Sequence, residues 1–92
     1  MRIRWLNRAE QSMRSAHNYI AVSNPQVARR MTARIRSAVE HLAEFPLSGR
    51  RGAVEGTREL VVTGVPYIVV YESGDAEVVI LRVFHAKQDR LQ

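Results

Sequence analysis

The sequence predicts an α+β fold of two layers, β-α-α-β-β-β in chain order, with a helical hairpin packed on a mainly antiparallel four-stranded sheet. Three observations predict it. A short segment at the start alternates polar and apolar residues, two apolar stripes of helical period precede Pro46, and three β-like runs separated by short turns follow Gly56. A chain of 92 residues suits one domain, so we expect residues 1–92 to form a single unit.

The segment before Val22 predicts one strand and one helix. Residues 2–6 alternate in the way that is typical of a short strand. Asn7 is a good helix cap, and Glu10, three residues later, completes a capping box. The helix should run roughly from Arg8 to Val22. Its apolar stripe consists of Ala9, Met13, Ala16 and Ile20.

The second helix is predicted to begin at the Asn24-Pro25 pair. Asn24 can cap the helix, and Pro25 suits the first helical position, where no N–H is needed. Pro46 prevents further helix. Because the break between the two helices is short, they should form an antiparallel hairpin. The second apolar stripe consists of Val27, Met31, Ile35, Ala38 and Leu42.

Three further strands are predicted after a loop that spans Leu47–Gly56. Thr63-Gly64 and Ser73-Gly74-Asp75 separate them, as hairpin turns would. Strands joined in this way form an antiparallel meander, and the helical hairpin should cover its apolar face. The first strand of the chain should join the same sheet. The three predicted strands are Thr57–Val62, Tyr67–Glu72 and Glu77–Phe84.

The charge of the chain is basic and uneven. The formal net charge is +5, and every basic residue except Lys87 is an arginine. Residues 1–51 hold ten arginines and three glutamates, a net of +7, whereas residues 52–92 hold four basic and six acidic residues, a net of −2. Such a distribution suits nucleic acid or an acidic protein segment, and it equally suits a solvated helix surface. Both interpretations stay open at this point.

Several classes of protein are excluded by what the sequence lacks. The chain has no cysteine, which excludes disulfides and cysteine–zinc sites and indicates the reducing cytoplasm. No glycine pattern matches a phosphate loop, no serine nucleophile motif occurs, and the three histidines lie in different predicted elements. We therefore expect no metal and no cofactor. No long apolar segment follows the first charges, so we expect neither a signal peptide nor a membrane span.

Arg82 interrupts the apolar run of the last predicted strand. Alternation should place it on one face with Ile80 and Phe84, and should place Leu81, Val83 and His85 on the other. A charge in such a run must reach solvent, a counter-ion or a ligand. Arg58 and Arg82 could each pair with Glu59 or Glu72 across the sheet. The other interpretation is that one anionic groove is surrounded by Arg50, Arg51, Arg58 and Arg82.

Four stretches in order resemble the RelE/ParE toxin superfamily across nearly the whole chain. They are Pro46-Leu47-Ser48-Gly49-Arg50, Gly56-Thr57-Arg58-Glu59-Leu60, Pro66-Tyr67-Ile68-Val69-Val70-Tyr71 and Ile80-Leu81-Arg82-Val83-Phe84-His85. The resemblance implies the β-α-α-β-β-β fold and the toxin role in a type II toxin–antitoxin system. It also implies a cognate antitoxin whose flexible segment wraps the toxin, with operator DNA bound only through that antitoxin.

The resemblance implies two targets. ParE-like members inhibit DNA gyrase, whereas RelE-like members are metal-independent endoribonucleases that cut messenger RNA in the ribosome. Arg58 and Arg82 match the sheet arginines of the ribonuclease branch, Arg50 and Arg51 lie near its basic loop, and His85 is the nearby proton carrier. Its C-terminal tyrosine is not matched, because Gln88 lies about where it would fall. We therefore predict a gyrase inhibitor, with the ribosome-dependent ribonuclease as the alternative and a non-toxic binding domain as a third hypothesis.

Overall fold

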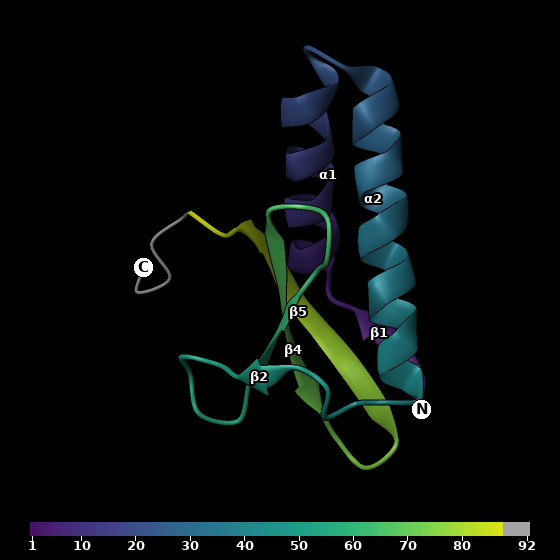
Figure 1. The fold of residues 1–92 in the computed structure, drawn as a ribbon. Helices are drawn as coiled ribbons and strands as arrows, with labels where there is room; N and C mark the ends of the chain where they lie inside the picture. The colour runs from purple at the N-terminus through teal and green to yellow at the C-terminus, as the bar shows by residue number, and fades with distance from the viewer. Residues whose placement is uncertain (88–92) are drawn as a thin grey trace.

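The computed structural model describes residues 1–87 as two layers, a helical hairpin and a five-stranded sheet (Figure 1). The two helices are α1 (Asn7–Ala21) and α2 (Pro25–Glu40), and a short 3₁₀ helix, η1 (His41–Ala43), follows α2. The strands are β1 (Arg2–Trp5), β2 (Arg50–Arg51), β3 (Arg58–Val61), β4 (Tyr67–Ser73) and β5 (Glu77–His85). Neither helix of the described chain has the length and apolar content that crossing a bilayer requires.

The sheet has the order β1-β5-β4-β3-β2, in which β1 runs parallel to β5 and the other neighbours are antiparallel. The predicted α+β fold is therefore confirmed. The sheet contains one strand more than predicted, because β2 lies inside the expected loop. A strand of two residues has no period of its own, and only its pairing with Arg58 and Glu59 makes it visible.

The predicted N-cap is confirmed for α2 but not for α1. Asn24 caps α2 as predicted, since its side-chain Oδ1 accepts a hydrogen bond from the backbone N–H of Val27 at 3.1 Å. The prediction that Asn7 caps α1 is wrong. Leu6 occupies the cap position without a side-chain bond, and Asn7 is already helical. The reason is that the Leu6 N–H still donates to the Ile80 carbonyl of β5, so the helix begins directly where the sheet ladder ends.

The core lies between the helical hairpin and the sheet. The predicted α1 residues Ala9, Met13 and Ala16 are buried there. On α2 the buried stripe is turned slightly from the prediction, because Val27 is 37% exposed whereas Ala28 is fully buried. The main sheet residues of this core are Tyr67, Val69, Tyr71, Val78, Ile80 and Val83.

A bulge in β5 changes which of its residues share a face. Val70 pairs with Arg82 while the next residue, Tyr71, pairs with Ile80, so Leu81 is the additional residue. Ile80 and Val83 consequently both belong to the core under the helices. The prediction that Ile80 shares a face with Arg82 is therefore wrong, because an extra residue reverses the alternation.

Candidate functional site

The sheet divides the four predicted arginines between its two faces. Cross-strand partners point to the same side of a sheet. Arg50 pairs with Glu59, Glu59 with Val70, and Val70 with Arg82, so Arg50 and Arg82 belong to one row. Arg51 pairs with Arg58, and Arg58 pairs with the core residue Tyr71. Arg51 and Arg58 therefore belong to the inner side, which carries the core residue Tyr71, whereas Arg50 and Arg82 belong to the outer face.

The outer row that contains Arg50 and Arg82 also contains an acidic residue, Glu59. Glu59 is only 4% exposed, and its Oε1 lies 3.0 Å from Nη2 of Arg50. The guanidinium of Arg82 stacks on the ring of Phe84 at 4.8 Å. A hollow of about 490 Å³ on this face is lined by two arginines and two glutamates among its ten residues. Those four are Arg8, Arg82, Glu59 and Glu72, so the hollow is electrically balanced.

Arg58 is bonded to the backbone of the loop that precedes β2. Its Nη1 donates to the Gly49 carbonyl at 2.8 Å and to the Leu47 carbonyl at 3.4 Å. The buried hydroxyl of Tyr71 holds the same loop, since it donates to the Pro46 carbonyl at 2.7 Å and accepts from the Gly49 N–H at 2.9 Å. A Cβ at position 49 would lie 2.7 Å from this hydroxyl, so the loop approaches the sheet too closely for a larger residue. Arg58 thus supports the loop.

His85 lies on the other side of β5 from Arg82. It pairs with Tyr67 of the core, and the two rings meet edge to face at 5.2 Å. Its Nδ1 accepts the backbone N–H of Lys87 at 3.1 Å. Burial raises the pKa of the Tyr67 phenol, and the neighbouring Tyr19 raises it further, so Tyr67 is a poor base at neutral pH. Gln88 lies outside the described residues.

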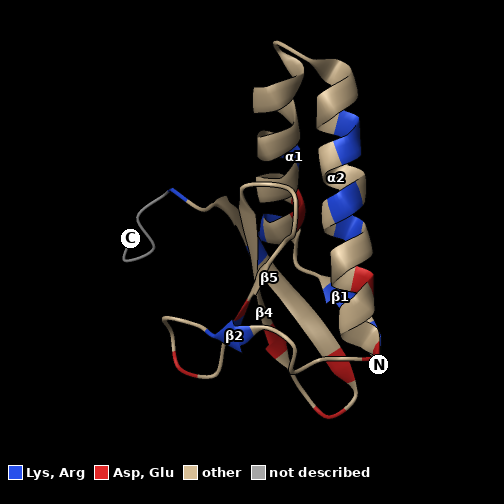
Figure 2. Cartoon of the chain, in the orientation of Figure 1, with Lys and Arg blue, Asp and Glu red and all other residues tan. Residues whose placement is uncertain are grey.

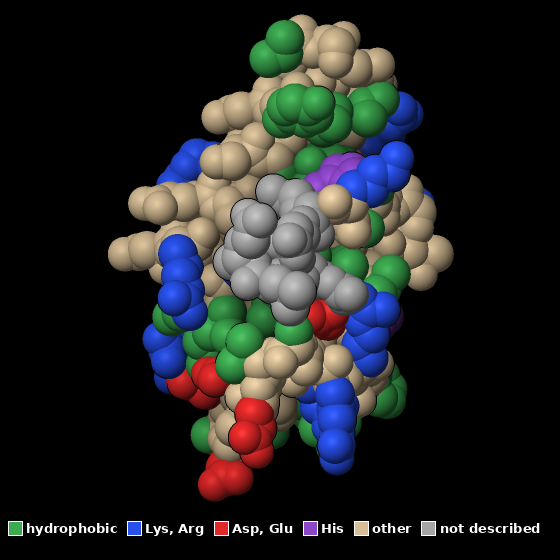
Figure 3. Space-filling view, turned by 90° about the vertical axis from the view of Figure 1, so that its left-hand side faces the viewer, with side chains coloured by type: hydrophobic (Ala, Val, Ile, Leu, Met, Phe, Trp, Pro, Cys, Tyr) green, Lys and Arg blue, Asp and Glu red, His purple; other side chains and the backbone are tan. Residues whose placement is uncertain are grey.

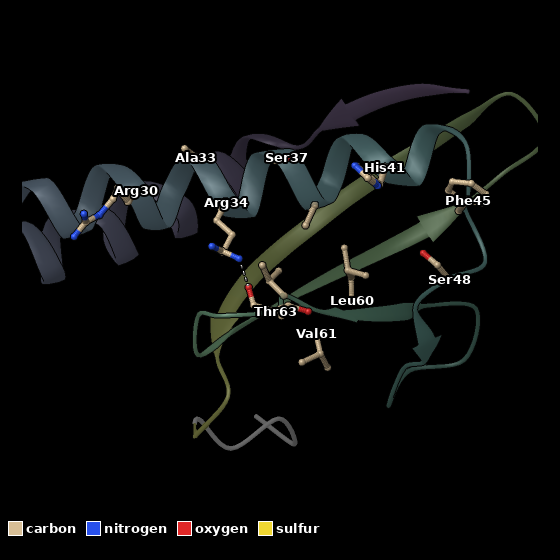
Figure 4. Close-up of a pocket in the computed structure, with 12 residues that line it drawn as sticks. Arg30, Ala33, Arg34, Ser37, His41, Phe45, Ser48, Leu60, Val61 and Thr63 are labelled. Atoms are coloured by element: carbon tan, nitrogen blue, oxygen red, sulfur yellow. Dashed lines mark hydrogen bonds between the residues drawn. The ribbon is translucent and has the colours of Figure 1, made fainter.

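A groove between α2 and β3 is a feature that the sequence did not predict (Figure 4). It has a volume of about 780 Å³. Its lining includes Ala33 and Ser37 of α2 and Leu60 of β3, and Phe45 lies at one end (Figure 4). The sequence indicates this groove only through the surface of α2 that lies away from the buried stripe, where small and basic residues recur at helical spacing. These residues are Arg30, Ala33, Arg34, Ser37 and His41.

The charges of the two layers differ (Figure 2). Arginines occupy the middle of α2 and Glu40 ends it, whereas further acidic residues lie near the β4–β5 turn and in the loop between β2 and β3. The side view shows the same mixture, with cationic side chains at both flanks and acidic ones at the lower end (Figure 3). Residues 1–87 contain no group of three or more His, Asp or Glu side chains that could hold a metal ion.

Comparison with known proteins decides the family. A family model described as the ParE toxin of the type II toxin–antitoxin system parDE matches residues 3–90. The chain belongs to the ParE toxin family. The protein Y4kP of Sinorhizobium fredii is 48% identical to it over 88 residues, covering 95% of this chain and 90% of Y4kP. Toxin RelE2 of Caulobacter vibrioides is 39% identical over 82 residues, covering 89% and 91%.

A solved structure of the chromosomal ParDE system of P. aeruginosa has the same fold as this ParE-family toxin. The TM-score is 0.82 at 23% identity, and the match covers 92% of this chain and 95% of that chain. The resemblance to the RelE/ParE superfamily is thereby confirmed. The protein is a toxin of a type II toxin–antitoxin system, and this family implies a cognate antitoxin as its partner.

Proposed function

We propose that this toxin inhibits DNA gyrase by binding it and that its cognate antitoxin, which alone contacts operator DNA, neutralises it in the cytoplasm. The observation that supports the proposal is that the sheet separates Arg58 from Arg82, the two arginines that match the ribonuclease branch. Arg58 belongs to the inner side of the sheet and is bonded to backbone carbonyls, whereas Arg82 belongs to the outer face. Two cations on opposite sides of a sheet are poorly placed to stabilise one phosphate.

The position of His85 also favours gyrase as the target. General acid–base catalysis requires the proton carrier within hydrogen-bond reach of the reacting group. His85 packs on Tyr67, on the other side of β5 from Arg82. A phosphate held by Arg82 would thus be separated from His85 by the sheet. A toxin that acts by binding needs no catalytic residues around one phosphate, so the arrangement favours gyrase inhibition over RNA cleavage.

Purified toxin and purified gyrase test the proposal directly. We expect loss of supercoiling and accumulation of cleaved DNA held by gyrase, both reversed when the antitoxin is added. Toxin that halts growth on expression yet leaves supercoiling and cleavage unchanged would contradict the proposal. Expression that leaves growth unimpaired at confirmed protein levels would instead support a non-toxic binding domain.

The alternative is a ribosome-dependent, metal-independent endoribonuclease. One relative, 39% identical to this chain, carries the name Toxin RelE2, which favours this alternative. In it, Arg58 and Arg82 would hold the scissile phosphate and His85 would transfer a proton. Toeprinting on translating ribosomes distinguishes the two targets, because only a ribonuclease gives codon-dependent cleavage. That cleavage should disappear in the Arg82→Ala, His85→Ala double variant.

A further inference from the structure

The two residues of β2 pair with β3 in electrically opposite ways. On the outer face Arg50 pairs with Glu59, and the two side chains form an ion pair at 3.0 Å. On the inner side Arg51 pairs with Arg58, so two cationic residues lie directly opposite each other. The Cβ atoms of such cross-strand partners are about 5 Å apart, and like charges in this position destabilise a sheet. One of the two residue pairs that join β2 to the sheet is therefore repulsive in the isolated chain.

Support of the neighbouring loop explains Arg58 but not Arg51. Nη1 of Arg58 donates to the carbonyls of Gly49 and Leu47, whereas its Nε and Nη2 form no hydrogen bond within residues 1–87. The side chain of Arg51 is exposed, and among the same residues it has no hydrogen-bond or ion-pair partner. Arg51 therefore adds a repulsive charge to the sheet without forming a bond that stabilises the fold.

A hollow of about 670 Å³, which we call the inner hollow, is lined by both of these arginines. Ser73 of β4 also lines it, and its hydroxyl forms no hydrogen bond within the described part of the chain. Glu55 is the one acidic residue among the lining residues, and it is exposed and forms no ion pair with either arginine. The inner hollow thus offers guanidinium and hydroxyl donors that no carboxylate of residues 1–87 occupies.

The loop between β2 and β3 forms one wall of the inner hollow. The Gly52 N–H donates to the Thr57 carbonyl at 2.8 Å, and the Thr57 N–H donates to the Val54 carbonyl at 3.1 Å. Gly56 has a φ of 85°, and a Cβ at Gly52 would collide with the Thr57 hydroxyl, so the turn requires both glycines. The loop projects from the sheet, away from the helical hairpin (Figure 1). A long polymer can therefore reach the inner hollow as readily as a small anion can.

The lining of the inner hollow favours the backbone of a nucleic acid as the ligand. Guanidinium and hydroxyl groups are common donors to phosphate oxygens, and two guanidiniums suit the charge of a phosphodiester. None of the ten described lining residues is aromatic, so the hollow has no ring on which a base could stack. Such a site holds phosphate groups without reading the base sequence.

We propose that Arg51, Arg58 and Ser73 bind a phosphodiester of the duplex DNA that gyrase holds, so that the toxin contacts the enzyme and its DNA together. The bound phosphate offsets the repulsion between the two opposed guanidiniums. The contact is independent of base sequence, so recognition of operator DNA is left to the antitoxin. The inference rests on the proposed function only for the source of the DNA. Because duplex binding can be measured without gyrase, the two proposals can fail separately.

Binding of duplex DNA to the full-length toxin is the first test. The probe is a fluorescent, mixed-sequence duplex of about 20 base pairs, and anisotropy at several salt concentrations measures its affinity. Arg51→Ala should weaken binding at least about fivefold and reduce the salt dependence by about one phosphate contact. Arg29→Ala is the matched control, since it removes an exposed arginine of α2 that does not line the inner hollow, and it should change affinity less than about twofold. An equal loss in both variants would indicate diffuse attraction and refute the site.

Three further probes identify the ligand. A duplex with uncharged methylphosphonate linkages should not bind, because the phosphate charge is gone. Single-stranded RNA of the same length should bind no more tightly than the duplex, and inorganic phosphate at the concentration of the DNA phosphates should not displace the duplex. Tighter binding of RNA, displacement by inorganic phosphate, or binding of the uncharged duplex would each overturn the proposal.

Two properties of the Arg51 variants separate a phosphate contact from a structural role. Arg51→Lys keeps the charge but loses the planar fork, so its affinity for the duplex should lie between those of the wild type and Arg51→Ala. Arg51→Ala should unfold at the same or a slightly higher urea concentration, because it removes one of two opposed cations. A clear fall in the unfolding midpoint would show that Arg51 supports the fold and would contradict the proposal.

Gyrase supplies the final readout. DNA-free gyrase should bind Arg51→Ala as tightly as it binds the wild-type toxin, whereas less cleaved DNA should accumulate with the variant. Undiminished accumulation of cleaved DNA would refute a contact with the DNA on gyrase. If the wild-type toxin leaves gyrase unaffected while Arg51 still governs duplex binding, the proposed function fails and the phosphate site remains.

Discussion

The loop–sheet junction, formed by residues 46–59 with Tyr71, and the groove between α2 and β3 both carry arginines, but they use them differently. At the junction Arg50 is paired with Glu59 and Arg58 is bonded to two carbonyls of its own chain. At the groove Arg30 lines an apolar surface that has no acidic residue. Cations bonded within the chain hold its shape, whereas cations left on an apolar rim are available to a partner.

This difference yields a general expectation for substitutions. Changes at the junction should lower the free energy of unfolding, because they remove bonds that exist in the isolated toxin. Changes at the groove should leave stability nearly unaltered and weaken partner binding. The predictions below challenge or refine this division, from the largest expected effect to the smallest.

Tyr71→Phe should destabilise the toxin by about 2–3 kcal/mol, because it leaves the Pro46 carbonyl and the Gly49 N–H without their buried partner. Urea unfolding measures the loss. Tyr19→Phe is the matched control, since Tyr19 is 77% exposed, and it should change stability by less than about 0.5 kcal/mol. A similar small change for Tyr71→Phe would show that the loop is held by other contacts.

Arg58→Ala and Arg34→Ala compare the two regions directly, because each removes a guanidinium that donates to a backbone carbonyl. We expect about 1–2 kcal/mol of lost stability for Arg58→Ala, whose bond to Gly49 is partly buried, and less than about 0.5 kcal/mol for the exposed Arg34→Ala. Thermal and urea unfolding of both variants provide the measurement. Equal losses would remove the distinction between junction and groove.

Glu59→Gln tests whether the buried carboxylate keeps the outer face neutral. Stability should fall by about 1 kcal/mol, since Arg50 loses its ion pair but remains half exposed to water. Affinity for a short single-stranded RNA, measured by anisotropy at low salt, should rise because the row from Arg50 to Arg82 becomes purely cationic. Glu72→Gln is the control for charge alone. Unchanged RNA affinity in Glu59→Gln would show that Glu59 does not govern the charge of this face.

The smallest effect concerns the exposed ion pair between Arg4 of β1 and Glu77 of β5, whose Nη2 and Oε2 lie 3.0 Å apart. The hydrogen bond from Arg4 lowers the pKa of the Glu77 carboxyl below its usual 4.5. A carboxyl with a lowered folded-state pKa stabilises the fold above its unfolded-state pKa, and the contribution disappears as pH falls through the folded-state value. Glu77→Gln should therefore flatten the acid side of the stability profile slightly. Urea unfolding between pH 3 and 6, with Arg4→Gln as partner in a double-mutant cycle, measures this.

The helices and strands could be predicted because the residue patterns that specify them are local in the sequence. The helical periods gave the core residues Met13, Met31 and Ile35 correctly, and the Asn24-Pro25 pair gave the start of α2. The predicted cap of α1 was wrong because a tertiary contact sets the start of this helix. The hydrogen bond from Leu6 to Ile80 joins residues far apart in the chain. Local capping rules cannot include such a bond.

The candidate site was predictable only as a set of residues. That arginines mattered followed from composition, but their division between two faces depended on the pairing of β2 and on the bulge at Leu81. The groove between α2 and β3 was not predicted at all, because each of its walls is an ordinary amphipathic element when considered alone. Only the tertiary arrangement of α2 and β3 brings Ser37 and Leu60 to one groove.

The amino-acid sequence by itself determined the α+β class, the helical hairpin, the three later strands and the basic character of the N-terminal half. Those properties come from the period and composition of short segments, which neighbouring residues specify. The tertiary structure alone decided which arginines share a face, which cations are balanced by Glu59 and Glu72, and which sheet edge stays open. Those properties depend on strand register, and a shift of one residue moves a side chain from one face to the other.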